Sequence, residues 1–312
     1  MNLTERAAMR PLPLYTHPLY TDGIHPDARF PRERYHMITA RLEALGSELL
    51  SLKTAPLATQ QELALAHDPR YIQRFLSGEM SEKERRKIGL RPWTPLLIPR
   101  TQHIVGGALA ALKEVLSAGG VAANLAGGTH HAHYDWGSGF CVFNDLAICA
   151  RYALQQESVE RVAILDLDVH QGDGTATLLA GVDDAFTCSV HCAENFPFHK
   201  MKSDLDLPIP AGSGDQAYLS AVHQALGAIE RQQPSLILFQ AGVDALATDA
   251  LGRLEVSPEG MSARDELVLS FCAARGLPCV IFMGGGYSKP IEASVSAFAS
   301  LFCTAALVQQ RW

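Results

Sequence analysis

Two carboxylates and an imidazole occur at every second position after a short apolar run. The run Val162–Leu167 has the composition of a strand that is buried on both faces. Alternate residues of an extended chain point the same way, so Asp166, Asp168 and His170 are predicted to converge if extended backbone continues through Val169. Such a set at a strand end is typical of a metal site, because burying this much charge is costly without a metal. The alternative is that the acids cap the next helix.

A glycine-rich stretch, Gly127–Phe140, carries the second group of reactive side chains. Its adjacent His130 and His131 lie between glycine pairs that allow close approach of the backbone to a ligand. Imidazoles titrate near neutral pH, so the pair suits general acid–base chemistry. The alternatives are a second metal ligand set or loop histidines whose hydrogen bonds are satisfied within the protein, and the latter is the interpretation favoured for His133.

Two further groups follow later apolar runs. In Gln240–Asp249, Asp244 lies just past a predicted strand and is a candidate third metal ligand, with Asp249 as the alternative. In Met283–Ser288, three glycines present Tyr287 at the edge of the sheet, where its phenol is placed to donate a hydrogen bond to a developing oxyanion. No Lys-Ser/Thr pair follows these glycines, so they do not form a phosphate-binding P-loop.

Apolar strand patterns alternate with helical patterns along the chain, which predicts βαβ units and a parallel sheet. The expected strands are 13–15, 121–125, 162–167, 185–191, 235–241 and 278–283. The expected helices are 32–52, 59–64, 69–76, 100–118, 142–155, 216–231, 257–274 and 291–307. The predicted fold class is α/β, with an open parallel sheet flanked by helices in a single domain over residues 1–312. In such sheets the functional site lies beyond the carboxyl ends of the strands.

Other segments are expected to be irregular. Thr21–Pro31 is rich in Pro, Asp and His and is predicted to be a loop, and Ser81–Pro99 has no regular pattern. Gly172 and Gly174 are expected to break the strand before them and to leave Asp173 on a loop.

Composition excludes several classes of protein. The 312 residues are 47% hydrophobic and 19% charged, with a net charge of −7 and no strongly basic stretch, which argues against a nucleic-acid partner. The seven cysteines lack CxxC spacing and lie mostly in apolar runs, as in a cytoplasmic protein with reduced thiols. No apolar run long enough to span a membrane is expected. No apolar segment of secretory type follows Glu5, Arg6 and Arg10, so no signal peptide is predicted.

Four motifs together resemble the zinc-dependent histone deacetylase family, which has the arginase/deacetylase fold. They are GGTHHAHYDWGSGFCVFND (127–145), ILDLDVHQGDG (164–174), QAGVDALATDALGRLEVSP (240–258) and MGGGY (283–287). Their order and spacing match the family across about two thirds of the chain. HPDARFPRERY (25–35) and LGRLEVSPEGMSARDELV (251–268) resemble the class IV-like branch and its bacterial relatives.

The resemblance assigns roles to individual residues. It implies that Asp168, His170 and Asp244 hold zinc or iron(II). His131 is implied to be the general base and then the acid, and His130 the partner imidazole near the leaving group. The resemblance further implies that Asp166 pairs with His130, that Asp173 pairs with His131, and that Tyr287 polarises the scissile carbonyl.

The resemblance also implies an acyl channel and a potassium site. The channel would be lined by Gly139, Phe140, Phe196 and Leu251. The potassium ion would be surrounded, partly through carbonyls, by Asp166, Asp168, His170, Ser189 and Val190.

These roles imply metal-dependent hydrolysis of the amide bond of an acylated lysine or a similar amine. A ureohydrolase of the same fold is the rival enzyme, but its additional two-metal DxHxD-type pattern is missing from the sequence. A non-catalytic acyl-lysine binding protein would be expected to lack His131 or Tyr287, and both are present.

The sequence leaves the substrate open. The family's acidic rim residue, which gathers a peptide backbone, has no match in 88–97, so a small acylated amine is as compatible as an acyl-lysine protein or peptide. Some relatives have Asn where Asp173 stands, which leaves the charge state of His131 open. The class IV-like resemblance implies a preference for long acyl chains over acetyl if the apolar channel has room, so the choice between the two stays open. The oligomeric state also stays open.

Overall fold

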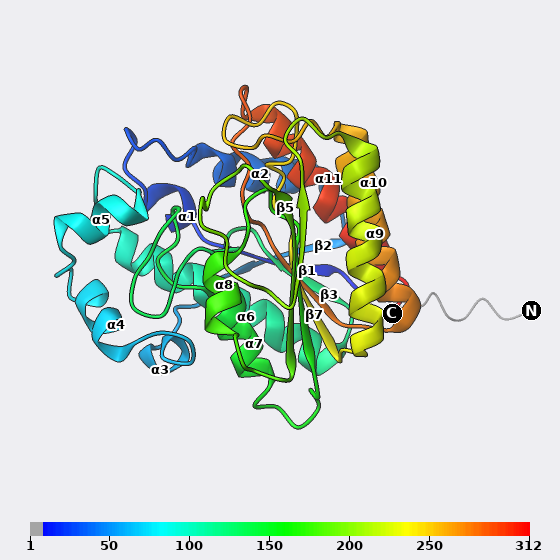
Figure 1. Ribbon diagram of the computed structural model, residues 1–312, viewed down its shortest axis with the longest axis horizontal. Helices are drawn as coiled ribbons and strands as arrows, with labels where there is room; N and C mark the ends of the chain where they lie inside the picture. The colour runs from blue at the N-terminus through cyan, green and yellow to red at the C-terminus, as the bar shows by residue number, and fades with distance from the viewer. Residues whose placement is uncertain (1–8) are drawn as a thin grey trace, which may run out of the picture.

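The computed structural model of the protein describes residues 9–312, so Glu5 and Arg6, on which the signal-peptide prediction rests, lie outside the described residues. Its centre is a parallel eight-stranded sheet with the order β2-β1-β3-β8-β7-β4-β5-β6 (Figure 1). The strands are β1 Leu12–Thr16, β2 Leu50–Thr54, β3 Val121–Asn124, β4 Val162–Asp166, β5 Ala185–Cys192, β6 Leu205–Ile209, β7 Leu236–Gln240 and β8 Cys279–Phe282. Parallel strands require crossovers, and helices provide most of them.

Helices cover both faces of the sheet. Helices α9, α10 and α11 form a layer on one face, and α6 and α7 pack on the other (Figure 1). The helices are α1 Leu19–Asp22, α2 Glu33–Ala44, α3 Gln60–Leu63, α4 Pro69–Leu76, α5 Glu82–Ile88, α6 Leu97–Ala118, α7 Asp145–Ala153, α8 Asp173–Leu178, α9 Asp215–Gln232, α10 Pro258–Arg275 and α11 Glu292–Gln309. The predicted α/β class is therefore confirmed.

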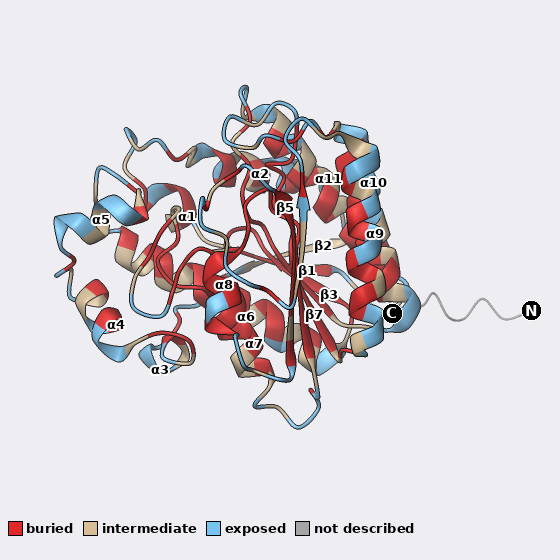
Figure 2. Cartoon of the chain, viewed as in Figure 1, coloured by how far each residue is buried: buried red, intermediate tan, exposed pale blue. Residues whose placement is uncertain are grey.

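The central strands are buried along their whole length. Every residue of β3, β4, β7 and β8 is buried, and the strands form the red centre of Figure 2. This burial is why their sequences are continuous apolar runs rather than alternating ones. All six strands predicted from such runs are present, and no end is shifted by more than one residue.

Two strands were not predicted from the sequence, and both lie at the edges of the sheet. β2 is only half buried and includes Ser51 and Lys53, so it lacks a continuous apolar run. β6 contains Asp206 and Pro208, and proline is tolerated in a strand mainly where no second neighbour needs its amide hydrogen. The segment 50–52 was wrongly assigned to a helix, because the helix pattern ends before Gly46, whose φ is +53°.

Other corrections concern short helices. α1 covers the start of the predicted loop 21–31, and α5 and the first turn of α6 lie within the region predicted to be irregular. The α5 helix has a capping box, in which Ser81 accepts from Glu84 N and the Glu84 carboxylate accepts from Ser81 N. Asp173 is not on a loop, because it is the first residue of α8.

Helix α11 corrects the expectation about membrane spans. By length and composition alone it would be long and apolar enough to cross a membrane, and 56% of the qualifying window is buried inside the protein. It packs against α10, α2, β1 and β3, which is the position of a core helix.

Five neighbouring strands deliver their following loops to one edge of the sheet. The chain leaves β3 toward His130, β4 toward Asp168 and β7 toward Asp244. It leaves β8 toward Tyr287 and β5 toward Phe196. Because β3, β8, β7, β4 and β5 are consecutive in the sheet, these loops meet at its carboxyl edge, as the sequence analysis predicts for the functional site.

Candidate active site

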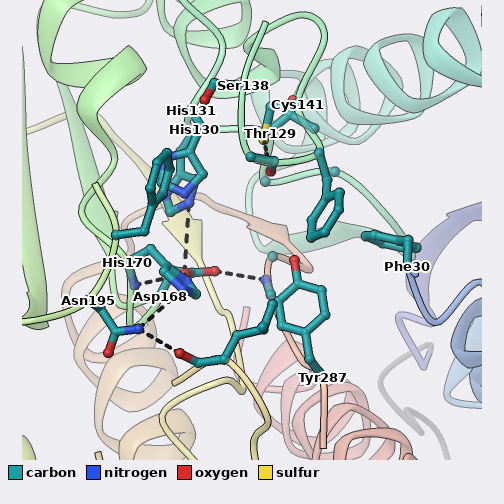
Figure 3. Close-up of a pocket in the computed structure, with 18 of the residues that line it drawn as sticks. Phe30, Thr129, His130, His131, Ser138, Cys141, Asp168, His170, Asn195 and Tyr287 are labelled. Atoms are coloured by element: carbon teal, nitrogen blue, oxygen red, sulfur yellow. Dashed lines mark hydrogen bonds and ion pairs between the residues drawn. The ribbon is translucent and has the colours of Figure 1, made fainter. Parts of the chain in front are cut away.

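Asp168, His170 and Asp244 form a compact buried group at this edge (Figure 3). One potential ligand atom from each side chain lies within 4.8 Å of the other two. Among residues 9–312, these three side chains form the one group of His, Cys, Asp or Glu that could hold a metal ion in this way. His170 Nδ1 is 3.0 Å from Asp168 Oδ1 and 3.1 Å from Asp244 Oδ2. The strand ends at Asp166 and the chain then bends, so convergence does not depend on extended backbone through Val169.

Backbone amides hold the two carboxylates in place. The Gly285 amide donates to Asp168 Oδ2 at 2.8 Å, and the Val169 amide donates to Asp244 Oδ1 at 2.9 Å. A Cβ atom on Gly285 would lie 1.9 Å from Asp244 Oδ2. Glycine is therefore required at this position, and the triple-glycine loop after β8 packs directly against both carboxylates.

The electrostatics of the group call for a cation. Asp168 and Asp244 are almost completely buried, and no Lys or Arg of residues 9–312 lies within 4 Å of either carboxylate. Burial, followed by repulsion from Asp168, raises the pKa of Asp244 to about 7. Two carboxylates and an imidazole are the donor types that bind zinc or iron(II), so these residues fit a divalent metal ion.

Each of the two adjacent histidines is paired with its own carboxylate. His130 Nδ1 lies 2.7 Å from Asp166 Oδ2, and His131 Nδ1 lies 2.6 Å from Asp173 Oδ1. A carboxylate only accepts hydrogen bonds, so Nδ1 carries the proton in both rings. The Nε2 atom of His131 is consequently the one left for chemistry.

The two imidazoles differ in charge although their rings are only 4.1 Å apart. Burial, followed by the positive charge of His130, lowers the pKa of His131 to about 4, against the opposing effect of Asp173. Burial also acts to lower the pKa of His130, but Asp166 and Asp168 outweigh it and raise that pKa to about 9. At neutral pH, His131 is a neutral base beside a cationic His130.

A cavity of about 370 Å³ leads from the surface to this group. Gly139, Phe140, Phe196 and Leu251 all line it, together with Tyr287. Gly139 has φ +53°, and a Cβ there would lie 2.5 Å from His131 Cδ2, so the wall passes very close to the imidazole. Burial raises the pKa of Tyr287 far above its usual value, so its hydroxyl stays protonated and can donate.

The residues expected around potassium lie on the neighbouring strands β4 and β5 and on the segment that follows β4. Ser189 of β5 pairs with Asp166 of β4 across the sheet, and Val190 is fully buried beside it. Ser189 Oγ lies 3.0 Å from His191 Nδ1. The structure thus brings Ser189 next to Asp166 and close to the chain that carries Asp168 and His170.

The remaining candidates of the sequence analysis have other partners. Asp249 is outside the three-ligand group and accepts hydrogen bonds from backbone amides. His133 Nε2 is 3.2 Å from Asp173 Oδ2 and its Nδ1 is 2.9 Å from Thr177 Oγ1, and its ring stacks on Trp136 at 3.8 Å. The hydrogen bonds of His133 are therefore satisfied within the protein.

The comparison with known families decides the affiliation of the chain. The histone deacetylase domain model matches residues 28–302. The chain belongs to the histone deacetylase domain family. The family predicted from the four motifs is confirmed.

Relatives and solved structures agree with this. An uncharacterized protein of the cyanobacterium Picosynechococcus is 40% identical over 282 residues, which cover 90% of this chain and 93% of that protein. Histone deacetylase 2 of Arabidopsis thaliana is 35% identical over 189 residues, 59% of this chain but only 49% of that protein. The crystal structure of acetylpolyamine aminohydrolase from Burkholderia pseudomallei has a TM-score of 0.78 at 23% identity, covering 95% of this chain and 99% of that one. This structural likeness confirms the predicted fold.

Two buried arginines of this histone deacetylase-family chain were missed in the sequence analysis. Arg34 and Arg100 line the cavity near Phe30 and Tyr35, and neither has a carboxylate within 4 Å among residues 9–312. Arg34 donates to the carbonyls of Gly284 and Gly286, at 2.9 and 2.8 Å. Arg34 lies in the motif 25–35, but its partners are 250 or more residues away, so sequence spacing gave no signal.

His67 supports the histidine loop of this family member from behind. It is fully buried, its Nδ1 donates to the His133 carbonyl at 2.9 Å, and its Nε2 accepts from the Asn144 amide at 2.7 Å. Both ring nitrogens are used by the neutral form, so protonation would cost the bond from Asn144. Burial lowers the pKa of His67 to about 4.

We expect His67→Gln to reduce the acid sensitivity of folding. A folded-state pKa below the unfolded value of 6.5 means that His67 contributes full stability above pH 6.5 and loses it as the pH falls toward 4. The full loss corresponds to about 3 kcal/mol of the free energy of unfolding. Urea unfolding at pH 7 and pH 4.5 measures it: the wild type should lose more stability between these values than the variant. Equal losses would contradict the buried neutral state.

Proposed function

We propose that this protein is a metal-dependent amide hydrolase that removes a short acyl group from a lysine side chain or a similar amine. One observation carries the proposal: Asp168 and His170 of the three-ligand group, His131 and Tyr287 all border a single cavity. An amide that enters this cavity meets a base, a metal site and a hydrogen-bond donor together.

Asp168, His170 through Nδ1, and Asp244 would hold the metal ion, zinc or iron(II). When bound there, the ion supplies Lewis-acid polarisation of the carbonyl and a water of lowered pKa. Two carboxylates and one imidazole leave coordination positions open, as in catalytic rather than structural sites.

The protein's own residues then move the protons. His131 Nε2 takes a proton from water as the water attacks the amide carbon, because its Nδ1–H is held by Asp173. The Tyr287 hydroxyl donates to the carbonyl oxygen as negative charge develops on it, and cationic His130 stabilises that charge. His131 gives the proton to the amine nitrogen as the C–N bond breaks. The products are a carboxylate and a free amine.

The buried part of the cavity lining that includes Arg34 and Arg100 suits the carboxylate product. Arg34 and Arg100 place two guanidinium groups there without a carboxylate partner, and Arg34 Nε is buried without a hydrogen bond. Burying unpaired cations is costly, and an anion that binds beside them recovers part of that cost.

The same guanidinium groups lead us to expect short acyl chains rather than the long chains implied by the class IV-like resemblance. A long alkyl chain that extends past the metal site would remove water from Arg34 and Arg100 without giving hydrogen bonds in return. We expect kcat/KM to fall at least about 10-fold from acetyl- to octanoyl-lysine in one peptide, which corresponds to a little over 1 kcal/mol. A kcat/KM that rises with acyl chain length would contradict the expectation that Arg34 and Arg100 disfavour long acyl chains.

The mouth of the cavity favours acyl-lysine over acylpolyamine. Lys87 and Arg253 line it with a single carboxylate, Glu194, which accepts a hydrogen bond from the Ala211 amide. The other amino groups of a bound acylpolyamine are positively charged and would lie outside the cavity, where Lys87 and Arg253 would repel them. Phe198, 83% exposed, and Leu251 offer apolar contact to a peptide instead.

A substrate panel tests the proposal. Release of free amine is measured from an acetyl-lysine peptide and from acetylspermidine, with His131→Gln as the control for contaminating activity. The proposal expects hydrolysis of both by the wild type, faster for the peptide, and loss of both in the variant. Hydrolysis that survives His131→Gln would contradict the mechanism.

Three further assignments complete the proposal. We place a structural potassium ion among Asp166, Asp168, His170, Ser189 and Val190, supported by the pairing of Ser189 with Asp166. We place the protein in the cytoplasm, supported by seven cysteines that form no disulfide. We also treat residues 1–312 as one domain, supported by a single sheet and a family match over 28–302.

A further inference from the structure

One carboxylate joins the two loops that follow β7 and β8. Asp249 Oδ1 accepts hydrogen bonds from the Leu251 and Gly252 amides, at 2.8 and 2.9 Å. Its other oxygen, Oδ2, accepts from the Tyr287 amide at 2.6 Å. No Lys or Arg of residues 9–312 lies within 4 Å of this carboxylate, so backbone amides are its principal partners.

The backbone around Tyr287 is attached to the same loop at several points. The Tyr287 carbonyl accepts from the Ala250 amide at 3.2 Å, and the Lys289 amide donates to the Thr248 carbonyl at 3.0 Å. Asp249 and Ser288 form an antiparallel bridge. Both backbone polar groups of Tyr287 are therefore bound by residues 249 and 250.

The phenol of Tyr287 is held much less directly. No hydrogen bond to its oxygen occurs within residues 9–312, and its ring has edge or tilted contacts with Phe30 and Phe140, at 6.0 and 5.9 Å between centroids. Figure 3 shows the hydroxyl directed toward the cavity, with Phe30 on the other side of the ring. The position of the hydroxyl thus depends on where the Tyr287 backbone is fixed.

We propose that Asp249 is the positioning residue for Tyr287: its carboxylate fixes the tyrosine backbone so that the hydroxyl meets the substrate carbonyl. This inference rests on the proposed function. It gives Asp249 a role other than metal ligation, because both of its oxygens are already bound by amides. A donor displaced by about 1 Å can cost about 100-fold in rate, so one backbone hydrogen bond can have a large effect.

The two oxygens of Asp249 make a selective variant possible. In Asp249→Asn, the side-chain oxygen can still accept hydrogen bonds from the backbone amides of Leu251 and Gly252. The new side-chain NH2 group then faces the backbone amide of Tyr287, and no hydrogen bond forms because both groups are donors. The opposite orientation would lose two hydrogen bonds instead of one, so the side chain keeps the first. The variant therefore keeps the cavity wall at Leu251 and loses only the hydrogen bond from the Tyr287 amide.

A double-mutant cycle with Tyr287→Phe tests the inference. We expect Asp249→Asn to lower kcat/KM roughly 10- to 100-fold in the wild type but less than about 3-fold in the Tyr287→Phe background, because the hydroxyl it positions is then absent. Metal content should be unchanged in all variants. The matched control is Thr248→Val, which removes only the 3.0 Å hydrogen bond between Thr248 Oγ and Ser288 Oγ and should keep nearly full activity. An equal loss in both backgrounds, or near-wild-type activity of Asp249→Asn, would overturn the inference.

The hydrogen-exchange rate of the Tyr287 backbone amide is a second measurement, and it does not depend on catalysis. The Tyr287 amide should exchange faster in Asp249→Asn than in the wild type or Thr248→Val, while amides of β4 stay unchanged. Unchanged exchange at Tyr287 would overturn the inference even if no amide substrate were found, and it therefore separates failure of the inference from failure of the proposed function.

Discussion

Asp244→Ala is expected to lose both the bound metal and amide hydrolysis. His170 Nδ1 lies about equally close to the two carboxylates, at 3.0 Å from Asp168 and 3.1 Å from Asp244, and residues 9–312 offer no other side chain to this group. Even residues behind the ligands typically cost 10- to 100-fold in metal affinity, so we expect loss of a ligand to lower activity by at least about 1,000-fold.

Metal analysis and kcat/KM on the same samples measure the effect. The fold should persist, because alanine removes a buried carboxylate whose pKa is raised by burial and by repulsion from Asp168. Unfolding in the presence of a chelator checks this point. Asp249→Asn is the matched control, since it also changes a carboxylate after β7 but should keep the metal. Full metal occupancy in Asp244→Ala would show that the ligand assignment is wrong.

Tyr287→Phe is expected to slow hydrolysis roughly 100- to 1,000-fold, the usual effect of removing one oxyanion donor. The substitution removes a single oxygen from a ring that packs against Phe30 and Phe140 and lies near the Arg34 guanidinium, so packing is retained. KM should change little, because the bond to the hydroxyl strengthens only as charge develops on the carbonyl oxygen.

Steady-state kinetics on the best substrate, with metal content and thermal unfolding of the same preparation, provide the test. A variant with near-wild-type kcat would make Tyr287 a structural residue. A variant that lost its metal would instead show that the Tyr287 loop supports the ligands through Gly285.

The site was predictable where chemistry and strand ends coincide in the sequence. Asp166, Asp168 and His170 are close in sequence and follow a strongly apolar strand. Asp244 and Tyr287 were candidates because they follow later apolar strands, and the family resemblance assigned their roles. The reason predicted for the convergence of these side chains is partly wrong, because the chain bends after Asp166 instead of staying extended. Convergence comes from hydrogen bonds to Gly285 and Asp244, which lie on the loops that follow β8 and β7.

The residues and strands that were not predicted depend on contacts between distant segments of the chain or lie at the edges of the sheet. Arg34 is read from sequence as one more charged helix residue, since the carbonyls of Gly284 and Gly286 that fix it are distant in sequence. The role of Asp249 is likewise set by a backbone amide 38 residues away. Edge strands β2 and β6 carry polar residues and a proline, which remove the apolar signal that identifies central strands.

The most direct test of the central claim is a metal titration of the chelator-treated wild type, with acetate release from an acetyl-lysine peptide followed at each addition of zinc or, without oxygen, iron(II). If Asp168, His170 and Asp244 hold the catalytic metal, activity should be absent at the start, rise linearly and level off at about one ion per chain. Asp244→Ala should stay inactive throughout. Acetate release that is independent of added metal, or none at full occupancy with both the peptide and acetylspermidine, would contradict the account.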